Sequence, residues 1–490
     1  MYPIHIGDPQ DIATARELLV RANFTEPAIA AMFGVPILTQ QTIDGFGDPP
    51  RQPSGILHLL IRLFVRNSYV DEQSIGEHLS AVETAALERL GLIAREPDNS
   101  SWYSPVCLCP VGDVYTISDR WKGPDGKPLE GREDIVYPSV VPNTRLFLDM
   151  LPDSRCESFL DLCSGTGVAA LIAGSRYAEQ AYAYDIAARS THFAEFARLL
   201  NGLTNVTTGT GDLYEPARGT TFDRIVAHPP YVPVLESKWI FFDGGDDGER
   251  VTRRIIEEAP RHLREGGTLY CLAMASDRAG APLEHRIREW LGPQQHEFDV
   301  AVVVRRTIEP QEFAFNSLSR GDGGAAPARQ WKELFEARRI TALPYAMMMV
   351  ERKAAGRKPL TLRRQTGHKT SREEHQWLLD WENRAASDPE AVLNIRLRAS
   401  PDCELRTLSR FTAGDWEAHE HNLAIDHPFR MEMKIDAWIA YLLTRCHGTR
   451  TGAELFDDLK SEGIIHSETV ARDFAQVLAT LVSGGFLLPL

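Results

Sequence analysis

The sequence has few cysteines and no long run of apolar residues. Its seven cysteines among 490 residues are an odd number without a regular spacing, which excludes a disulfide-stapled fold and is typical of reduced thiols in a cytoplasmic protein. The longest apolar run, residues 56–65, is interrupted by His58 and Arg62 and is far shorter than the roughly 20 residues of a membrane-spanning helix. Residues 1–10 have neither a basic start nor an apolar stretch, so we expect no signal peptide, no membrane partner and a cytoplasmic location.

The sequence also has fewer positively charged than negatively charged residues. The net charge of −15 opposes non-specific binding to nucleic acid, because that binding draws its energy from Lys and Arg side chains that neutralise phosphates. A protein or peptide partner is therefore favoured over nucleic acid. The densest basic segment, residues 352–372, is interpreted as a solvated linker, with a docking surface as the alternative.

The spacing of histidines and cysteines indicates no metal site. Cys107 and Cys109 form a C-x-C pair without the second pair that a zinc site needs, so we interpret them as strand residues. His419, His421 and His427 lack the i, i+4 spacing that places two imidazoles on one face of a helix. We therefore expect a function that needs no metal ion.

What the sequence does contain is the composition of a packed protein of several domains. Apolar residues make up 43% and charged residues 25%, as in average globular chains, and a chain of this length divides into about three domains of ordinary size. Changes in residue pattern place the boundaries. We predict an N-terminal domain at 1–142, a central domain at 143–355, a basic linker at 356–375 and a C-terminal domain at 376–490.

Both terminal domains show short helical segments followed by a β-type segment. In the N-terminal domain the pattern predicts helices at 56–67, 74–79 and 81–90 and a hairpin through 102–117. The end of the chain repeats this order, with its last apolar strand at 484–487. We expect two mainly helical, winged-helix-like domains, which select the substrate or form a homodimer rather than bind DNA, because the chain is acidic.

The central domain alternates short apolar strands with helical runs. Strands are predicted at 158–162, 180–184, 222–227 and 268–273, with helices between them. That alternation is typical of an α/β fold with a mostly parallel sheet.

Two further strands follow in the central domain, at 298–305 and 342–351. They bracket an insertion, 307–338, that contains a helical segment at 327–338. No helix of ordinary crossover length links the two strands directly, so we expect them to form an antiparallel pair at the edge of the sheet.

A glycine-rich turn follows the first strand of the central domain. Asp161 lies on that strand, and the turn Gly165-Thr166-Gly167 leads directly into a helix. Glycines permit unusual backbone angles and the close approach of a ligand. The turn by itself also fits the dinucleotide-binding loops, so an NAD-linked dehydrogenase stays an alternative at this point.

Three carboxylates at successive strand ends favour a ligand that carries a positive charge. Asp161 lies where it can receive an amino group. Asp185 ends the second strand, about 20 residues after the glycines, where an acidic residue binds the hydroxyls of a ribose. Asp212 follows the third strand, where it can accept a hydrogen bond from the amine of adenine. The set fits a cationic adenosyl ligand better than a pyrophosphate.

The fourth strand, at 222–227, leads into His228-Pro229-Pro230-Tyr231. The two prolines have no N–H donor and stiffen the chain, so the carbonyls beside them are free and fixed in direction. The end of a central strand faces the crevice in which α/β sheets bind ligands, and Tyr231 adds an aromatic face that can stack on a planar group. We predict that His228, Pro229, Pro230 and Tyr231 form the catalytic motif.

Residues 140–275 resemble the class I S-adenosylmethionine (SAM) methyltransferases, in particular the amino-group methyltransferases of the HemK/PrmC type. The resemblance is carried by Asp-x-x-x-Gly-x-Gly at 161–167, Gly-Asp-Leu at 211–213 and Pro-Pro-Tyr at 229–231, with further likeness at 243–248 and 263–267. It implies a Rossmann-like domain of seven strands with SAM as the cofactor. The cofactor-binding residues that it implies are Asp161, Cys163, Gly165, Thr166, Gly167, Asp185, Ile186, Asp212 and Leu213.

The family motif has asparagine where this chain has His228. In the family, the Asn carboxamide and the neighbouring proline carbonyl accept both hydrogens of a planar amide or of an aromatic amine. A neutral imidazole offers one acceptor and, unlike Asn, takes up a proton near neutral pH. This difference favours an acceptor that must lose a proton, with His228 either as its general base or as its hydrogen-bond partner.

The expected function is SAM-dependent methyl transfer to a nitrogen of a macromolecule, with a protein favoured because the chain is acidic. One alternative is a small-molecule N- or O-methyltransferase of specialised metabolism, in which the insertion at 307–338 would act as a lid. Another is a SAM-binding regulator without catalytic activity. A closed apolar pocket above His228 would favour the small molecule, and an open groove would favour the macromolecule.

Overall fold

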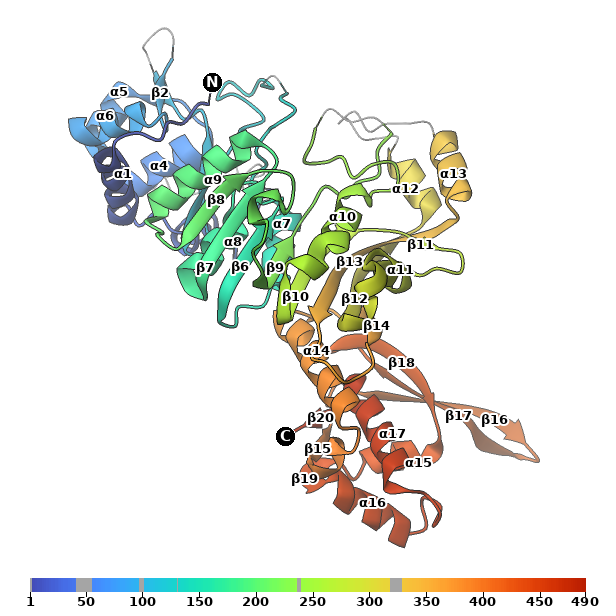
Figure 1. Ribbon diagram of the computed structural model, residues 1–490. Coiled ribbons are helices and arrows are strands. Elements are labelled where there is room, and N and C mark those ends of the chain that lie inside the picture. The colour runs from blue at the N-terminus through green and yellow to red at the C-terminus, as the bar shows by residue number, and fades with distance from the viewer. Residues whose placement is uncertain (1, 41–54, 97–100, 130, 236–238, 318–327) are drawn as a thin grey trace.

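The computed structural model describes residues 2–40, 55–96, 101–129, 131–235, 239–317 and 328–490. Three regions follow one another in space as they do in sequence. The N-terminal region lies at one end of the molecule, the central sheet with its helices in the middle, and the C-terminal region at the other end (Figure 1).

Seven strands of the central domain lie side by side in the order β8-β7-β6-β9-β10-β13-β12, as part of a larger sheet of twelve strands among the described residues. Neighbours from β8 to β10 are parallel, and β13 is antiparallel to both β10 and β12. The α/β fold with a mixed sheet is therefore confirmed. The strands are β6 (Cys156–Leu162), β7 (Ala178–Asp185), β8 (Val206–Thr210), β9 (Phe222–Ala227), β10 (Leu263–Met274), β12 (Phe298–Ile308) and β13 (Ile340–Arg352).

The strand order reverses direction between β6 and β9. From β6 the chain builds outward through β7 to β8, and β9 then starts the other half of the sheet on the opposite side of β6. A crevice opens at such a switch point, outside the carboxyl ends of the strands. The Gly165 turn follows β6 and His228 follows β9, so both motifs lie at the same crevice.

The helices around this crevice have clear sequence causes. Helix α8 (Val168–Arg176) starts at Gly167, which has a left-handed φ of 73°, and α9 (Ala188–Asn201) ends at Gly202, whose φ of 69° permits a left-handed helix end. Both helices lie between strands, as the alternation in the sequence predicts. Helices α10 (Arg250–Glu258) and α11 (Leu283–Trp290) follow β9 and β10.

Half of the segment predicted as a basic linker, 356–375, lies in regular elements. Residues Thr361–Thr366 form β14, which pairs in parallel with β12, and α14 (Arg372–Ser387) follows. The strands β12 and β13 are antiparallel, as predicted, but they are not an edge pair since β14 extends the sheet beyond β12.

Acidic partners from the central domain explain why this basic segment is not a solvated linker. Arg357 pairs with the buried Asp299. Arg363 pairs with Asp277 at 2.7 Å and with Glu284 at 3.0 Å. Net charge along the sequence does not reveal such partners, because they lie 58 to 86 residues away.

The N-terminal region consists of small helices and two separate β units. Its helices are α1 (Pro9–Arg21), α2 (Glu26–Phe33), α4 (Ile56–Leu60), the π-helix η1 (Ile61–Val65), α5 (Glu72–His78), α6 (Ala81–Arg89) and α7 (Pro142–Met150). The hairpin predicted through 102–117 is confirmed in its second part, where β4 (Cys107–Val111) pairs with β5 (Val114–Ser118). Its first part is wrong, because β3 (Ser101–Tyr103) pairs instead with β1 (Val70–Asp71) and β2 (Ala94–Arg95). Pro105, which has no N–H donor, separates β3 from β4.

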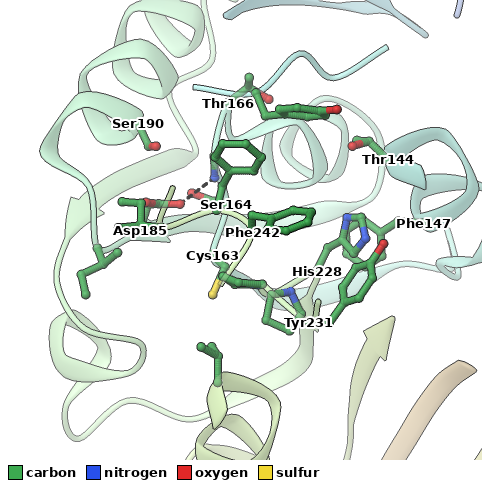
Figure 2. A pocket seen from close by; sticks show the side chains of 18 of the residues that line it. Thr144, Phe147, Cys163, Ser164, Thr166, Asp185, Ser190, His228, Tyr231 and Phe242 are labelled. Carbon is green, nitrogen blue, oxygen red and sulfur yellow. Dashed lines mark hydrogen bonds between the residues drawn. The ribbon is translucent and has the colours of Figure 1, made fainter. Parts of the chain in front are cut away.

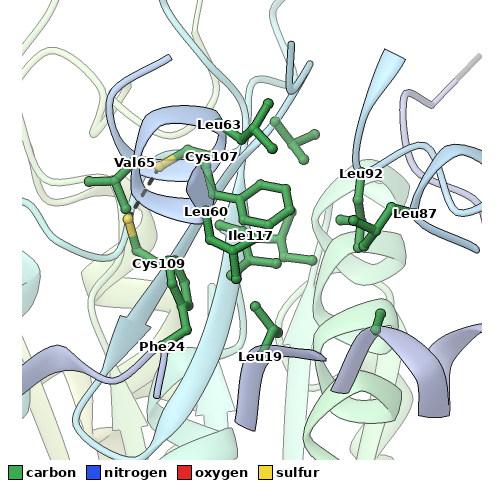
Figure 3. Close-up of a cluster of buried hydrophobic side chains, with 14 of the residues drawn as sticks. Leu19, Phe24, Leu60, Leu63, Val65, Leu87, Leu92, Cys107, Cys109 and Ile117 are labelled. Atoms are coloured by element: carbon green, nitrogen blue, oxygen red, sulfur yellow. Dashed lines mark hydrogen bonds between the residues drawn. The ribbon is translucent and has the colours of Figure 1, made fainter. Parts of the chain in front are cut away.

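One apolar core joins the N-terminal region to the central domain. Leu19, Phe24 and Leu63 belong to the same buried cluster as Phe193 and Phe196 of α9. Figure 3 shows the N-terminal side of this cluster, around β4. The two regions therefore pack against each other through a common apolar core and are not connected only by a flexible linker.

Cys107 and Cys109 lie within this core as residues of β4, in agreement with their interpretation as strand residues. Both are free thiols, and their sulfur atoms are 3.4 Å apart (Figure 3). Among the residues with described positions, no group of three or more His, Cys, Asp or Glu side chains is placed to hold a metal ion.

The C-terminal region contains more strand than predicted. Strand β18 (Phe429–Ile435) pairs with β14, so the central sheet continues into this region through β17 (Asp415–Ile425) to β16 (Glu404–Thr412). The expectation of a mainly helical domain is wrong for this part. The β16–β17 hairpin extends away from the body (Figure 1) and is largely exposed, so little apolar periodicity marks it in the sequence.

The last part of the chain has the predicted order of helices. It comprises η5 (Ala391–Asn394), β15 (Arg396–Ala399), α15 (Ala437–Leu443), β19 (His447–Thr451), α16 (Gly452–Ser461), α17 (Ala471–Ser483) and β20 (Leu487–Pro489). The strands form a small sheet in the order β19-β15-β20. The winged-helix-like character of both terminal regions stays a prediction. Within the described part of the chain, no helix is both long and apolar enough to cross a membrane.

Candidate active site

A cavity of about 850 Å³ opens at the carboxyl ends of β6, β7 and β9 (Figure 2). It brings together the two motifs of the central domain, because the carboxyl ends of parallel strands meet at one edge of a sheet. The predicted site residues that line it are Asp161, Cys163, Gly165, Thr166, Asp185, Ile186, Asp212, Leu213, His228, Pro229, Pro230 and Tyr231.

Gly167, also predicted to bind the cofactor, lies behind the turn instead of lining the cavity. A Cβ at Gly167 would approach the Cβ of Ala194 to 3.0 Å, so this glycine lets α8 pack closely on α9. A Cβ at Gly165 would meet no atom within 4 Å. The backbone of Gly165 is therefore bare toward the cavity, which is the arrangement that a ligand lying against the loop needs.

One buried and one half-buried carboxyl group stand beside the loop. Burial raises the pKa of Asp161 well above its usual range, and only 3% of the residue is exposed. Asp185 accepts hydrogen bonds from the backbone N–H groups of Gly165 and Ala187 at 2.8 and 2.9 Å, and burial also raises its pKa. A bound cation would offset the cost of burying these negative charges.

Residues that follow β6, β7 and β8 complete the cofactor side of the cavity. Ile186 is 61% exposed although it lines the cavity, so a flat apolar group can cover it. Asp212 is half-exposed and pairs with Arg254 at 2.8 Å. Cys163 and Leu213 have left-handed φ angles of 56° and 52°, a strained conformation for side-chain-bearing residues that is concentrated at functional sites.

His228 stands on the opposite side of the cavity, stacked between two aromatic rings. Its ring centroid is 5.2 Å from that of Phe147 and 5.6 Å from that of Tyr231 (Figure 2). Its Nε2 is buried and has no hydrogen-bond partner among the described residues. Burial lowers the pKa of His228 from 6.5 to about 4, so the imidazole is neutral near pH 7 and has an unused polar atom.

Tyr231 is fixed in position from both sides. Its hydroxyl accepts a hydrogen bond from Nδ2 of Asn143 at 2.9 Å. Behind its backbone lies the loop that contains Gly244 and Gly248. A Cβ at Gly248 would approach the Tyr231 carbonyl oxygen to 2.5 Å, and one at Gly244 would approach the Tyr231 carbonyl carbon to 2.7 Å. The likeness noted at 243–248 therefore has a physical basis, because only glycine lets this loop pack against the catalytic motif.

Aromatic residues cover the cavity above the motif. Tyr137 stacks on Phe241 with centroids 5.0 Å apart, and Phe242 lies next to Phe241 at 6.4 Å; all three line the cavity. Tyr137 and Ile240 are 41% and 42% exposed. The cavity therefore reaches the surface along an apolar wall that joins the N-terminal region to the segment after the catalytic motif.

The insertion between β12 and β13 lies on the other side of Tyr231. Its helices α12 (Pro310–Ser317) and α13 (Ala328–Ala337) bury Phe313, Trp331 and Phe335 in a small core against which Tyr231 packs. No described residue of the insertion lines the cavity. Residues 318–327, which also belong to the expected lid, lie outside the described part of the chain.

Several residues of the site were missed by the sequence analysis. Phe147 and Asn143 come from α7, more than 80 residues before the motif residues that they contact. Tyr137 comes from the preceding segment and stacks on Phe241. An aromatic residue or an asparagine at such a distance has no spacing that points to the site. Phe241 and Phe242 directly precede residues 243–248, which resemble the methyltransferase family. Their position next to this segment was the only feature of the sequence that could have placed them at the site.

Glu249 anchors the loop behind Tyr231 through a buried ion-pair network. It is 2% exposed and accepts hydrogen bonds from Arg286, from Arg278 and from both the backbone and the hydroxyl of Ser276. We expect Glu249→Gln to lower the free energy of unfolding by about 3–5 kcal/mol, because it leaves the buried Arg286 cation without its counter-charge. Urea unfolding measures this loss.

Glu257→Gln on the same helix is the matched control. Glu257 pairs with Arg253 at the surface, so its replacement is expected to change stability by at most about 1 kcal/mol. Equal losses of stability in the two variants would show that Glu249 is not an anchor.

Comparisons with known proteins agree with this geometry. The family model of the methyltransferase small domain matches residues 139–295. A putative protein N5-glutamine methyltransferase of Methanocaldococcus jannaschii is 30% identical over 153 residues, which are 29% of this chain and 77% of that protein.

Two further relatives match shorter shares of their own length. The ribosomal protein uL3 glutamine methyltransferase of Bradyrhizobium diazoefficiens is 36% identical over 128 residues, 24% of this chain and 40% of that protein. The release factor glutamine methyltransferase of Thermodesulfovibrio yellowstonii is 32% identical over 173 residues, 33% of this chain and 60% of that protein. The matched region carries both motifs that line the cavity. The chain belongs to the methyltransferase small-domain family of SAM-dependent methyltransferases.

Proposed function

We propose that this protein transfers a methyl group from SAM to a nitrogen atom of a protein side chain. The observation that carries the proposal is the position of His228, which holds an unpaired, buried Nε2 between two aromatic rings in the cavity that the glycine turn also lines. The exposed Tyr137 and Ile240 at the cavity wall support a large acceptor over an enclosed small molecule. Three relatives named as protein glutamine methyltransferases support a protein acceptor.

The residues of the cavity fit SAM. Asp161 suits the amino group of its methionine part, Asp185 suits the ribose hydroxyls, and the exposed Ile186 suits a face of adenine. When bound, SAM supplies an electrophilic methyl group on a positively charged sulfur. The carboxyl groups of Asp161 and Asp185 stabilise that positive charge.

The catalytic motif holds the acceptor nitrogen. Neutral His228 accepts one hydrogen of that nitrogen through its free ring nitrogen. The carbonyls beside Pro229 and Pro230 accept a second hydrogen, since the prolines fix their direction. Tyr231, held by Asn143, stacks on the planar group. These contacts fix the nitrogen lone pair in one direction, which is the main task in a direct transfer. The bond between nitrogen and methyl forms as the bond between methyl and sulfur breaks, and the proton that the methylated nitrogen then loses passes to water.

The lowered pKa of His228 supports one of its two expected roles. An imidazole with a pKa of about 4 takes up a proton poorly near neutral pH, so a general base for an ammonium group is disfavoured. A hydrogen-bond partner needs only the neutral ring. We therefore propose an acceptor nitrogen that is already neutral, such as a side-chain amide, rather than an ammonium.

The pH dependence of the reaction tests this role. We expect kcat/KM to be flat between about pH 6 and pH 8 and to fall only as His228 is protonated near pH 4. A general base with an ordinary pKa would give a fall near pH 6.5. Because the folded-state pKa is lowered, His228 stabilises the fold fully above pH 6.5 and loses this contribution as the pH falls through about 4. Circular dichroism at each pH therefore separates lost folding from lost catalysis.

The reaction is tested by incubating the purified protein with radiolabelled SAM and an extract of its source organism. Incorporation into protein that survives nuclease treatment and disappears with protease supports a protein acceptor. Mass spectrometry of the labelled peptides then identifies the methylated nitrogen. Label that stays in molecules below about 1 kDa would favour the small-molecule alternative and overturn the proposal.

A further inference from the structure

A second cavity, of about 390 Å³, lies between the N-terminal region and the loop 120–129. Its described lining includes three cationic side chains, Arg66, Arg120 and Lys122, and one acidic residue, Asp119. The Asp119 carboxylate is already engaged by the guanidinium of Arg189. The cavity is therefore positively charged, in contrast to the chain as a whole.

Arg120 is the central cation of this cavity. Its Nε donates to the carbonyl oxygen of Ser104 at 3.0 Å, and its Nη2 donates to the carbonyl oxygens of Leu63 and Phe64 at 2.8 Å. Among the described residues, no carboxylate lies within ion-pair distance of it, and Nη1 makes no hydrogen bond. Burial lowers the pKa of Arg120. Carbonyl dipoles offset only part of a buried charge, so a full anion would be stabilised here.

Hydrogen bonds hold the walls of the cavity in place. The π-helix η1 ends at its edge, where Asn67 adopts a left-handed φ of 54° and donates a hydrogen bond from Nδ2 to the Lys122 carbonyl oxygen at 2.6 Å. The loop folds back on itself, with Gly123 N–H donating to the Lys127 carbonyl at 2.8 Å. Single π-turns of this kind are concentrated at functional sites.

Only a layer of aromatic rings separates this cavity from the active site. Trp121 lines the second cavity, and its ring centroid lies 5.8 Å from that of Tyr137 and 6.2 Å from that of Phe241, which both line the active-site cavity. Gln40 lines both cavities. An extended peptide advances about 3.3–3.6 Å per residue, so a residue only a few positions from the methylated one can reach Lys122.

We propose that this second cavity binds a carboxylate side chain of the protein acceptor, and that Arg120 and Lys122 thereby select acceptors with an acidic residue close to the methylated nitrogen. A cavity of this size admits a carboxylate head group and its cations match the charge of that group. The ring wall between the cavities offers the intervening acceptor residues an apolar surface. This inference rests on the proposed function for the identity of the occupant, but not for the existence of the anion site.

The anion site is tested without methyl transfer, by calorimetric titration with glutarate, a dicarboxylate that mimics an acidic side chain. We expect saturable binding to the wild type and binding about tenfold weaker to Lys122→Glu. Arg120→Gln should abolish binding, but it also removes three contacts to carbonyls and can unfold the protein. The exposed Lys122 therefore carries the test. The affinity for SAM should be the same in all folded variants, because neither residue lines the cofactor cavity.

Lys127→Glu is the matched control, with the same change of charge in the same loop but outside the cavity. It should leave glutarate binding at the wild-type level. No saturable binding to the wild type, or equal weakening in the Lys122 and Lys127 variants, would overturn the anion site.

Methyl incorporation into the proteins of the cell extract tests whether the carboxylate that binds in the second cavity belongs to the protein acceptor. Glutarate should inhibit incorporation by the wild type in competition with the protein acceptor, and Lys122→Glu should raise the KM for extract protein while its kcat is unchanged. Glutarate binding without inhibition would show that the site takes a free small anion and would overturn the assignment to the acceptor. A loss of all incorporation with intact glutarate binding would instead count against the proposed function.

Discussion

Replacing His228 by alanine is expected to lower kcat by about a hundredfold to a thousandfold and to leave the dissociation constant of SAM unchanged. The substitution removes the imidazole that accepts the acceptor hydrogen, and it removes the ring between Phe147 and Tyr231. The acceptor nitrogen then loses both its partner and its fixed direction. The cofactor side of the cavity, around Asp161 and Asp185, does not touch this ring stack.

The matched variant is His228→Asn, which restores the residue of the family motif. Its carboxamide oxygen accepts the same hydrogen, so kcat should stay within about tenfold of the wild type. The fall in kcat/KM near pH 4 should be absent from this variant, because Asn does not titrate. Single-turnover kinetics and calorimetry separate the chemical step from SAM binding. Full turnover by His228→Ala would show that the imidazole has no part in the reaction.

Replacing Asp185 by alanine is expected to weaken SAM binding by about a hundredfold, since charged hydrogen bonds of this kind each contribute about 1.5–3 kcal/mol. The carboxylate also accepts from the N–H groups of Gly165 and Ala187, so the loop loses its internal support together with its ligand contact. At saturating SAM, kcat should recover most of its wild-type value. Calorimetry with SAM and with its demethylated product measures the effect.

Asp212→Ala is the control for this second prediction. Asp212 is half-exposed and already pairs with Arg254, so its loss should weaken SAM binding by less than about tenfold. If Asp185→Ala and Asp212→Ala weakened SAM binding equally, Asp185 would not have the special role that its position at the end of β7 indicates.

The central fold could be predicted because its signals are local. Strands β6 and β9 are buried on both faces, and such strands are near-continuous apolar runs in the sequence. The turn glycines mark where each strand gives way to a helix. Once the sheet is parallel, the strand ends at Asp161, Asp185 and His228 must share one edge, which is why spacing alone brought most of the site residues together.

The linker and the C-terminal strands could not be predicted for a different reason. The arginines at 357 and 363 are neutralised by Asp299 and Asp277, which are distant in sequence. The β16–β17 hairpin exposes nearly all of its side chains, so it lacks the alternation that marks a strand with one buried face. The hairpin is stabilised by the backbone pairing of β16 with β17 and by the pairing of β17 with β18. The residue composition of the hairpin does not indicate either pairing.

The sequence by itself determined the α/β fold of the central domain and the placement of the glycine turn and of His228-Pro229-Pro230-Tyr231 at strand ends, because each depends on residues within a few positions of one another. Only the tertiary structure decided the state of His228. Its pKa is set by burial between Phe147 and Tyr231, and Phe147 lies 81 residues away in sequence. Desolvation depends on everything packed around a group, whatever its position along the chain. The chemical role of a titratable residue is therefore a property of the folded protein.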